Sequence, residues 1–361
     1  MAESPPDTER YARQIGLAGF GAAAQARLAA SGVLVVGAGG LGVPAATYLA
    51  AAGVGRIGLV DDDRVAATNL HRQVAYTPAD IGRPKVDALA ERLRAQNPAV
   101  EVTTYPRRLT LAGAEELVRG YDLVLDGSDN LPTRYLVDDL CALVGRPLVY
   151  GAAQAFEGQV AVFHATGASP TYRCLFPEDP AHAAIPNCAV GGVLGVVPGI
   201  IGTLQALEAV KVLTGVGEAL DGRLLVVDGL TGAQRTLAVA AVAANRTVSR
   251  ALLLARHAEP EEVSPADLAL RLAEGAPTVD VRTAAERAAD PLPGAEHVPL
   301  ARFDEWLATR AADLAGQVCF VCASGRRSRE AARRFNRATG SRRGLTVAGG
   351  AAALAQQRQR A

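Results

Sequence analysis

The chain is 361 residues long, 49% hydrophobic and 20% charged, which is enough for about two to three domains with separate cores. Lys and Arg together number 37, as do Asp and Glu, and this zero net charge excludes a uniformly basic nucleic-acid binder and an acidic disordered chain. Five cysteines do not indicate a disulfide scaffold, and the first residues lack a signal-peptide pattern, so we expect a cytoplasmic protein.

The first 245 residues alternate short apolar runs with segments of helical periodicity. We predict strands at 33–36, 56–63, 101–106, 121–129, 147–153 and 159–165, and helices at 43–53, 85–98 and 134–145. This alternation is typical of α/β proteins. The sequence therefore predicts a doubly wound, mainly parallel, Rossmann-like sheet.

One uncharged stretch, residues 183–207, is long enough to cross a bilayer. It contains five glycines and two prolines, which dilute its apolar character. We therefore expect a buried loop and helix here, and no association with a membrane.

A change in charge marks a second domain. Residues 1–245 hold 19 basic and 24 acidic residues, whereas residues 246–361 hold 18 and 13. The periodicity of apolar residues fades where the charge changes. We therefore predict a first domain at 1–245, a linker at 246–259 and a small α/β domain at 260–361. In the second domain we predict strands at 278–282 and 317–323 and a helix at 328–338.

A glycine-rich turn, residues 37–42, follows the first predicted strand and opens a helix. Glycines let the backbone approach phosphate oxygens, and the helix N-terminus adds partial positive charge. Asp61 ends the next predicted strand, where a ribose-binding carboxylate belongs. The turn alone fits a dinucleotide dehydrogenase, a mononucleotide enzyme or a packing role.

The residues that follow favour an enzyme that consumes ATP. Arg72 and Lys85 can neutralise a triphosphate, and a carboxylate of the later segment 126–130 can hold Mg²⁺. Taken singly, each cation could equally be an ordinary surface residue. The region lacks GxxxxGK[ST], which excludes a P-loop NTPase.

Five segments in order carry a family resemblance: RYARQI at 10–15, GAGGLG at 37–42, DDDRVAATNLHRQ at 61–73, GRPK at 82–85 and DGSDN at 126–130. Over about residues 8–236 the chain resembles MoeB/ThiF-type adenylyltransferases, prokaryotic relatives of ubiquitin-activating enzymes. The resemblance implies adenylation of the C-terminal glycine of a small ubiquitin-fold sulfur carrier. It also implies ATP contacts at Gly40, Asp61, Asn69, Arg72, Lys85, Asp129 and Asn130.

Two further roles follow from the same resemblance. Asp129 corresponds to the carboxylate that binds Mg²⁺ and the adenylate. Arg13 corresponds to an arginine finger that reaches the ATP of a neighbouring subunit, which implies a homodimer. An ionised carboxylate attacks the α-phosphate directly, so the reaction needs no general base.

Three cysteines of the first domain have different expected roles. Cys141 lies in an apolar helical pattern, which predicts a core position. Cys174 lies where the family usually has Cys-x-x-Cys, one half of a structural zinc site, but here Thr171 occupies the first position. Four ligands are not available, so we predict no zinc. Cys188 matches the family's cysteine proposed to form a transient covalent link to the carrier, although a packed cysteine fits this position as well.

The second domain contains a cysteine loop, residues 322–328 (CASGRRS), which follows a predicted strand and precedes a helix. Backbone N–H groups at a helix N-terminus and nearby arginines lower the pKa of a thiol, which favours a reactive thiolate or persulfide at Cys322. Cys319 is expected in the core. Position 328 is Ser, so the Cys-x5-Arg pattern of phosphatases is absent.

Over about residues 260–354 the chain resembles rhodanese sulfurtransferases. The matching pieces are 262–265, 279–282, 294–300, the cysteine loop and 347–350, although the segment between Arg282 and Pro293 departs from the usual pattern. The resemblance implies a persulfide loop containing Cys322, Gly325, Arg326 and Arg327. It also implies a structural brace at Arg282.

Together, the two resemblances predict activation of a carrier as its acyl-adenylate and sulfur transfer from the Cys322 persulfide, which yields a thiocarboxylate for molybdopterin, thiamine or sulfur-amino-acid synthesis. The expected sulfur donor is a cysteine desulfurase or thiosulfate. Two alternatives stay open. One is an NAD-dependent dehydrogenase with a regulatory rhodanese-like domain, and the other is a scaffold whose rhodanese module only docks partners.

Overall fold

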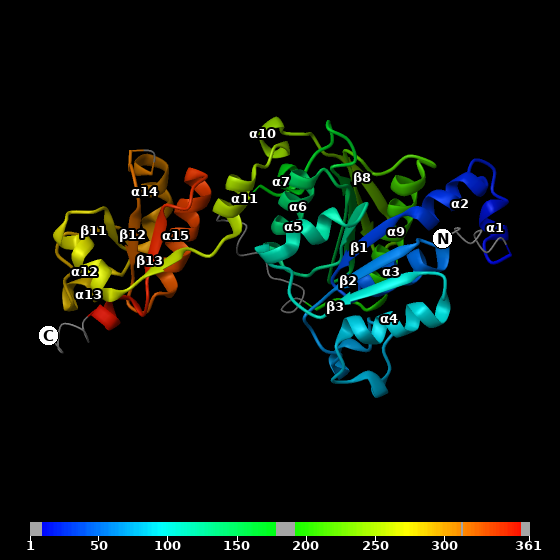
Figure 1. Cartoon of the computed structure of the whole chain (residues 1–361), viewed down its shortest axis with the longest axis horizontal. Helices are drawn as coiled ribbons and strands as arrows, with labels where there is room; N and C mark the ends of the chain where they lie inside the picture. Colours follow the sequence, from blue (N-terminus) through cyan, green and yellow to red (C-terminus); the bar gives the residue numbers. More distant parts are fainter. Residues whose placement is uncertain (1–8, 178–191, 312, 355–361) are drawn as a thin grey trace. The chain divides into compact units, whose positions relative to one another are not determined.

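A computed structural model describes residues 9–177, 192–311 and 313–354 of the chain (Figure 1). The chain divides into two compact units, Met1–Val248 and Ser249–Ala361. Each unit contains a sheet of its own.

The first unit is built on a sheet in the order β3-β2-β1-β4-β5-β6-β7-β8 (Figure 1). Neighbours from β3 to β5 run parallel, whereas β5 to β8 are antiparallel. This confirms the predicted doubly wound, mainly parallel sheet and adds an antiparallel edge. The strands are β1 (Gly32–Val36), β2 (Arg56–Val60), β3 (Glu101–Tyr105), β4 (Leu123–Asp126), β5 (Leu148–Gln154), β6 (Glu157–Phe163), β7 (Arg223–Asp228) and β8 (Gln234–Ala238).

The strand order reverses at β1, because β2 and β3 lie on one side of it and β4 and β5 on the other. In open α/β sheets, ligands bind outside the carboxyl ends of the strands at such a reversal. The order therefore places the expected nucleotide site at the ends of β1 and β4.

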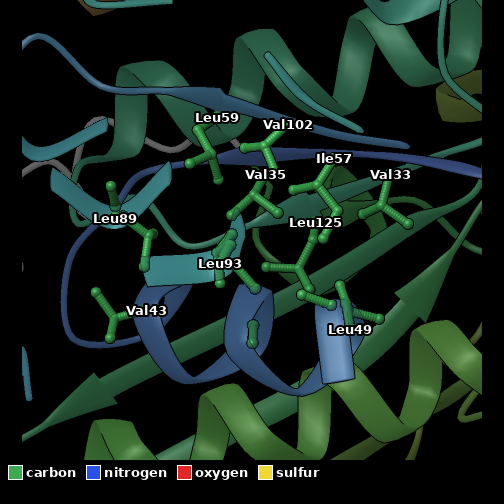
Figure 2. Close-up of a cluster of buried hydrophobic side chains, with 14 of the residues drawn as sticks. Val33, Val35, Val43, Leu49, Ile57, Leu59, Leu89, Leu93, Val102 and Leu125 are labelled. Carbon is green, nitrogen blue, oxygen red and sulfur yellow. The ribbon is translucent and has the colours of Figure 1, made fainter. Parts of the chain in front are cut away.

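Helices cover this sheet. Those of the first unit are α1 (Ala12–Ile15), α2 (Gly21–Ala30), α3 (Gly42–Ala52), α4 (Lys85–Gln96), α5 (Leu111–Arg119), α6 (Leu131–Val144), α7 (Tyr172–Leu175), α9 (Val196–Thr214) and α10 (Ala243–Arg246), with short 3-10 turns at Ala67–Asn69 and Pro78–Asp80. Figure 2 shows Leu49 of α3 and Leu93 of α4 beside Val35 of β1 and Ile57 of β2, all of them at most 1% exposed. This shared core fixes both helices against the strand ends that form the site.

Helix α9 is the described helix whose length and composition would allow it to cross a membrane. It packs on α3, β5 and β6, and it buries Ile201 and the polar side chains of Gln205 and Glu208. The Gln205 amide donates to the Asp126 carbonyl at 2.7 Å. These contacts fit the core helix that the sequence predicts, whose preceding loop lies largely outside the described residues.

The second unit has a parallel sheet in the order β11-β10-β12-β13-β9. Its strands are β9 (Glu261–Val263), β10 (Thr278–Asp280), β11 (Glu296–His297), β12 (Val318–Val321) and β13 (Gly344–Val347). Its helices are α11 (Arg250–His257), α12 (Pro265–Ala273), α13 (Ala284–Ala289), α14 (Phe303–Arg310) and α15 (Arg326–Thr339), with a 3-10 turn at Leu300–Arg302. A small α/β domain was expected from the sequence here.

The segment expected as a linker, residues 246–259, contains a helix. The Ser249 hydroxyl caps α11 by accepting a hydrogen bond from the Leu252 amide, and Leu253 and Ala255 are buried. Helix α11 packs against α15, so the second unit includes most of this segment. The sequence analysis missed this helix because periodicity fades here and Pro260 and Pro265 follow the segment.

Helices α3 and α9 approach each other closely, so a side chain added between them should destabilise the first unit. A Cβ on Gly202 of α9 would lie 2.2 Å from the Leu41 carbonyl oxygen, whereas a Cβ on Gly199 would meet nothing within 4 Å. We expect Gly202→Ala to destabilise the first unit by about 1–3 kcal/mol, because backbone must move. Gly199→Ala on the same helix is the control and should stabilise by about 0.5–1 kcal/mol. Thermal unfolding followed by circular dichroism measures both, and equal shifts would contradict the predicted packing.

Candidate active sites

A pocket of about 760 Å³ opens at the carboxyl ends of the parallel strands in the first unit. Its lining includes every residue expected to contact ATP: Gly40, Asp61, Asn69, Arg72, Lys85, Asp129 and Asn130. The structure thus gathers residues spread over some ninety positions of sequence into one cavity. Their individual roles stay predictions.

The glycine turn between β1 and α3 requires glycine at two positions. Gly37 has φ +99°, and a Cβ on it would lie 2.7 Å from the Gly127 carbonyl oxygen. A Cβ on Gly42 would lie 1.8 Å from the Gly37 carbonyl oxygen. The turn therefore brings the start of α3 close to the segment that follows β4, and its backbone borders the pocket.

Asp61 is fixed at the end of β2. Its carboxylate accepts hydrogen bonds from the Ala38 amide at 2.7 Å and the Asp63 amide at 2.8 Å. Burial raises the pKa of Asp61, and this effect is partly offset by Lys85 and by these two amides. The carboxylate is thereby oriented at the pocket wall, where it can accept from a sugar hydroxyl.

The two expected phosphate-binding cations are held by neighbours. The buried Lys85 ammonium lies 2.7 Å from an Asp63 carboxylate oxygen. The Arg72 guanidinium donates to the Thr68 carbonyl at 3.0 Å and contacts a His71 ring nitrogen at 2.8 Å. Sequence reasoning missed the Asp63 contact, which orients Lys85 but also competes with an incoming phosphate for its charge.

Asp129 and Asn130 end the turn after β4. The Asn130 side-chain oxygen caps α6 by accepting from the Thr133 amide at 3.0 Å, which leaves its amide hydrogens for a ligand. Asp129 is exposed in the pocket, and the structure records no partner for it among the described residues. A single carboxylate beside a triphosphate fits Mg²⁺, which usually keeps several waters and phosphate oxygens as ligands.

Among the described residues, Asp129 does not belong to a group of three or more side chains that could share a metal ion. Within the described ranges, the group of acidic residues close enough to share a metal ion is Asp61, Asp62 and Asp63. Asp63 pairs with Lys85, and Asp62 lies 3.6 Å from Arg108. These contacts account for the acidic group without a metal.

One expected catalytic residue is not brought to this pocket, and another cannot be placed. Arg13 lies on α1, is exposed and does not line the pocket of its own chain. Cys188 lies outside the described residues. Cys141 is fully buried on α6, as expected, and burial raises the pKa of its thiol.

Among the described residues, the groups that contact the Cys174 sulfur are not zinc ligands. Its sulfur accepts from the Val242 amide at 3.2 Å and lies 3.4 Å from the Thr171 hydroxyl and 3.8 Å from the Asn245 side-chain nitrogen. Burial alone would raise the pKa of this thiol, but hydrogen bonds from Thr171, Val242 and Asn245 lower it. One sulfur with a hydroxyl and an amide does not supply the four nitrogen or sulfur ligands of a structural zinc site.

In the second unit, Cys322 directly follows β12. It packs on the same side of the sheet as Phe320, whereas Cys319 packs on the other side, as strand alternation predicts. Its sulfur accepts from the Gly325 amide at 3.1 Å and lies 3.5 Å from the Ser328 hydroxyl. Burial opposes ionisation, yet the hydrogen bonds from Ser328, Ser324 and Gly325 leave the pKa of Cys322 below its ordinary value.

The arginines of this loop differ in their contacts. Arg327 makes a two-pronged ion pair with Glu286 of α13, with N–O distances of 2.8 and 2.5 Å. Arg329 pairs with Glu262, whereas Arg326 is exposed with no recorded partner in the described part of the chain. The sequence could not distinguish these neighbours, because the partners lie 41 and 67 residues away.

Arg282 has the bracing geometry that the resemblance implies. Its buried guanidinium pairs with the fully buried Asp280 at 2.8 Å and donates to the Asp290 carbonyl at 2.9 Å. The Arg282 carbonyl oxygen lies 3.0 Å from a ring nitrogen of His297. These contacts hold the segment that carries Glu286 and, through it, Arg327.

Sequence reasoning missed one buried residue of the first pocket. Arg134 lines the pocket from α6 and is only 9% exposed. It lies one helical turn after Asn130, and this spacing from a capping residue was the available signal.

Comparison with known proteins agrees with this geometry. The ThiF family model matches residues 11–248, and a rhodanese-like domain model matches residues 264–357. A sulfur carrier protein adenylyltransferase of Thermus thermophilus is 53% identical over 243 residues, 66% of this chain and 90% of the relative. The mouse adenylyltransferase and sulfurtransferase MOCS3 is 44% identical over 319 residues, 82% of this chain and 69% of the relative.

Another relative, the maize adenylyltransferase and sulfurtransferase MOCS3-1, is 47% identical over 228 residues, which is 63% of this chain and 48% of the relative. The chain thus matches about half the length of this relative. Among solved structures, Escherichia coli MccB with ATP superposes with a TM-score of 0.58 at 18% identity, covering 68% of this chain and 76% of that one. This likeness supports the fold alone.

These relatives are named as adenylyltransferases and sulfurtransferases, and they give no support to the dehydrogenase alternative. The first match extends over more than half of the chain. The protein therefore belongs to the ThiF family and carries a rhodanese-like domain after its ThiF domain.

Proposed function

We propose that the chain adenylates the C-terminal glycine of a small ubiquitin-fold sulfur carrier and then transfers sulfur to it from Cys322. The observation that carries the first half is the single pocket that holds all seven expected ATP contacts beside the glycine turn. The second half rests on the thiol at the start of α15, whose pKa is lowered. The named relatives act as enzymes of these two classes.

In the first step, backbone amides of the glycine turn and the start of α3 receive the phosphates, and Asp61 receives the ribose. Arg72 and Lys85 neutralise the triphosphate, and Asp129 would hold a magnesium ion, which would supply further positive charge beside the phosphates. The carrier's carboxylate oxygen bonds to the α-phosphorus as the bond to pyrophosphate breaks. The chain mainly positions groups and balances charge.

In the second step, the terminal sulfur of a Cys322 persulfide attacks the acyl carbon and AMP leaves. The product is an acyl disulfide, in which carrier and Cys322 share two sulfurs. A dithiol reductant then supplies two electrons, which releases the carrier thiocarboxylate and the Cys322 thiol. Cysteine desulfurase or thiosulfate is the proposed source of the sulfur.

Homodimer formation is part of the proposal, with Arg13 reaching the ATP of a second subunit. Arg13 is exposed and outside its own pocket. Exposed apolar side chains gather on the adjacent helices α3 and α9: Tyr48, Val196, Ile200 and Leu207 are 42–63% exposed. Such a patch suits an interface between protein chains.

The remaining expectations stay proposals. We propose a cytoplasmic protein that binds no nucleic acid and no membrane, in keeping with its zero net charge. We also propose that Cys188 forms a transient covalent link to the carrier.

Pyrophosphate exchange tests the adenylation step. With a carrier that supports ATP–pyrophosphate exchange, we expect Asp129→Ala to slow exchange about 100- to 1000-fold, because charge compensation at the reacting phosphate is lost. Glu101→Ala, an exposed change on β3 outside this pocket, is the control and should match the unmodified protein. Undiminished exchange in Asp129→Ala would refute the role of that carboxylate.

The pH dependence of alkylation tests the persulfide loop. Because the pKa of Cys322 is lowered, its thiolate forms as pH rises through a midpoint below that of an ordinary thiol. We expect peptide-resolved iodoacetamide labelling of Cys322 to reach half its maximum below pH 9, and Ser328→Ala to move this midpoint upward. Cys319, whose pKa burial raises to about 12, is the internal control. Equal midpoints for both cysteines would contradict the assignment.

Metal analysis tests the zinc prediction. We expect no stoichiometric zinc in the purified protein and no effect of chelators on its melting temperature. Replacing Thr171, Val242 and Asn245 together by cysteine should create zinc binding, because these positions surround the Cys174 sulfur. The same variant with Cys174→Ser is the control. One zinc per chain in the unmodified protein would refute the prediction.

A further inference from the structure

The pocket of the first unit extends along the sheet from the end of β2 to β5. Asp61 and Lys85 line one part of it, at the ends of β2 and α4. Beyond β4, the lining continues to Ala153 of β5 and Val193, two strands away from the β1 turn. The second part therefore lies on the side of the glycine turn away from Asp61 and Lys85.

Arg134 is a cation of this second part. It lies on the first turns of α6, is 9% exposed and lines the pocket. Its guanidinium lies 5.3 Å from the centre of the Tyr150 ring and donates to the Tyr150 hydroxyl at 3.3 Å. It also donates to the Ser128 carbonyl at 2.9 Å. These contacts hold the planar group in one orientation.

The hydrogen-bonding capacity of this guanidinium is not used up. Five N–H groups are available to an arginine, and Nε of Arg134 is buried without a hydrogen-bond partner. Among the described residues the structure records no ion pair of Arg134, and the carboxylate whose charge acts on it is Asp126. Burial raises the pKa of the nearby Asp126, and the charge of Arg134 opposes this rise. A buried cation in this condition is stabilised by an anionic ligand.

We propose that Arg134 binds the C-terminal carboxylate of the carrier before it attacks the α-phosphate. This inference rests on the proposed function. The attacking carboxylate and the triphosphate repel each other, and an arginine on the acceptor side lowers that repulsion while its planar fork orients the carboxylate oxygens. Lys85 lines the other part of the pocket, at the start of α4.

A bracing role makes a different prediction. Arg134 fixes the Ser128 carbonyl, and the Ser128 amide in turn donates to Asp126 at 2.9 Å. If Arg134 only held this turn, its loss would weaken nucleotide binding. The preference for a carrier with a C-terminal carboxylate over one with a carboxamide would then be unchanged. A double-mutant cycle, in which both Arg134 and the carrier's C-terminus are changed, therefore distinguishes the two roles.

The experiment compares the affinity of the protein for two forms of a carrier that supports pyrophosphate exchange. One form has a free C-terminal carboxylate, and the other has a C-terminal carboxamide. Calorimetry is done with the full chain loaded with an ATP analogue that cannot be cleaved at the α-phosphate. We expect the unmodified protein to prefer the carboxylate about 10-fold or more, as for other hydrogen bonds to charged groups. Arg134→Gln should abolish this preference and leave analogue affinity within about 3-fold. Tyr150→Phe, which keeps the cation, should retain the preference.

Each outcome decides the proposal. Equal affinities for carboxylate and carboxamide in the unmodified protein overturn it even if Arg134→Gln does not fold. If Arg134→Gln still prefers the carboxylate, Arg134 has only the bracing role. The same conclusion follows if Arg134→Lys keeps the full preference while its affinity for the analogue falls. Failure of pyrophosphate exchange with every ubiquitin-fold carrier overturns the proposed function, and this inference with it.

Discussion

Close contact between two backbone turns is the constraint on which the first site depends. At the carboxyl end of β1, Gly37 has φ +99°, and a side chain there would strike the Gly127 carbonyl after β4. Because the turns touch, the start of α3 faces the segment that carries Asp129. Separation of the two turns would move the amides at the start of α3 away from the Asp129 carboxylate, even if every charged residue remained.

The second unit uses a similar arrangement for a different anion. A strand, β12, ends at a turn whose Gly325 has φ +89°, and helix α15 starts from it. In one unit the turn faces a pocket suited to phosphate, and in the other it surrounds a thiol whose pKa is lowered. Both steps of the proposed reaction thus depend on backbone N–H groups at a helix start.

Local patterns made much of this predictable. The apolar runs placed the parallel strands, and the glycine spacing placed the turn, because each depends on neighbours in sequence. The contacts of Lys85 with Asp63 and of Arg327 with Glu286 were missed, since they join segments that only the folded chain brings together. Arg134 was missed for the same reason: its burial against Tyr150 depends on how α6 packs on β5.

A structure of the protein with a non-hydrolysable ATP analogue tests the central claim most directly. The account predicts the phosphates at the amides of Gly39 and Gly40 and the ribose hydroxyls on Asp61. An analogue bound outside this pocket, or with its sugar on the β5 side and its phosphates remote from the glycine turn, would contradict it.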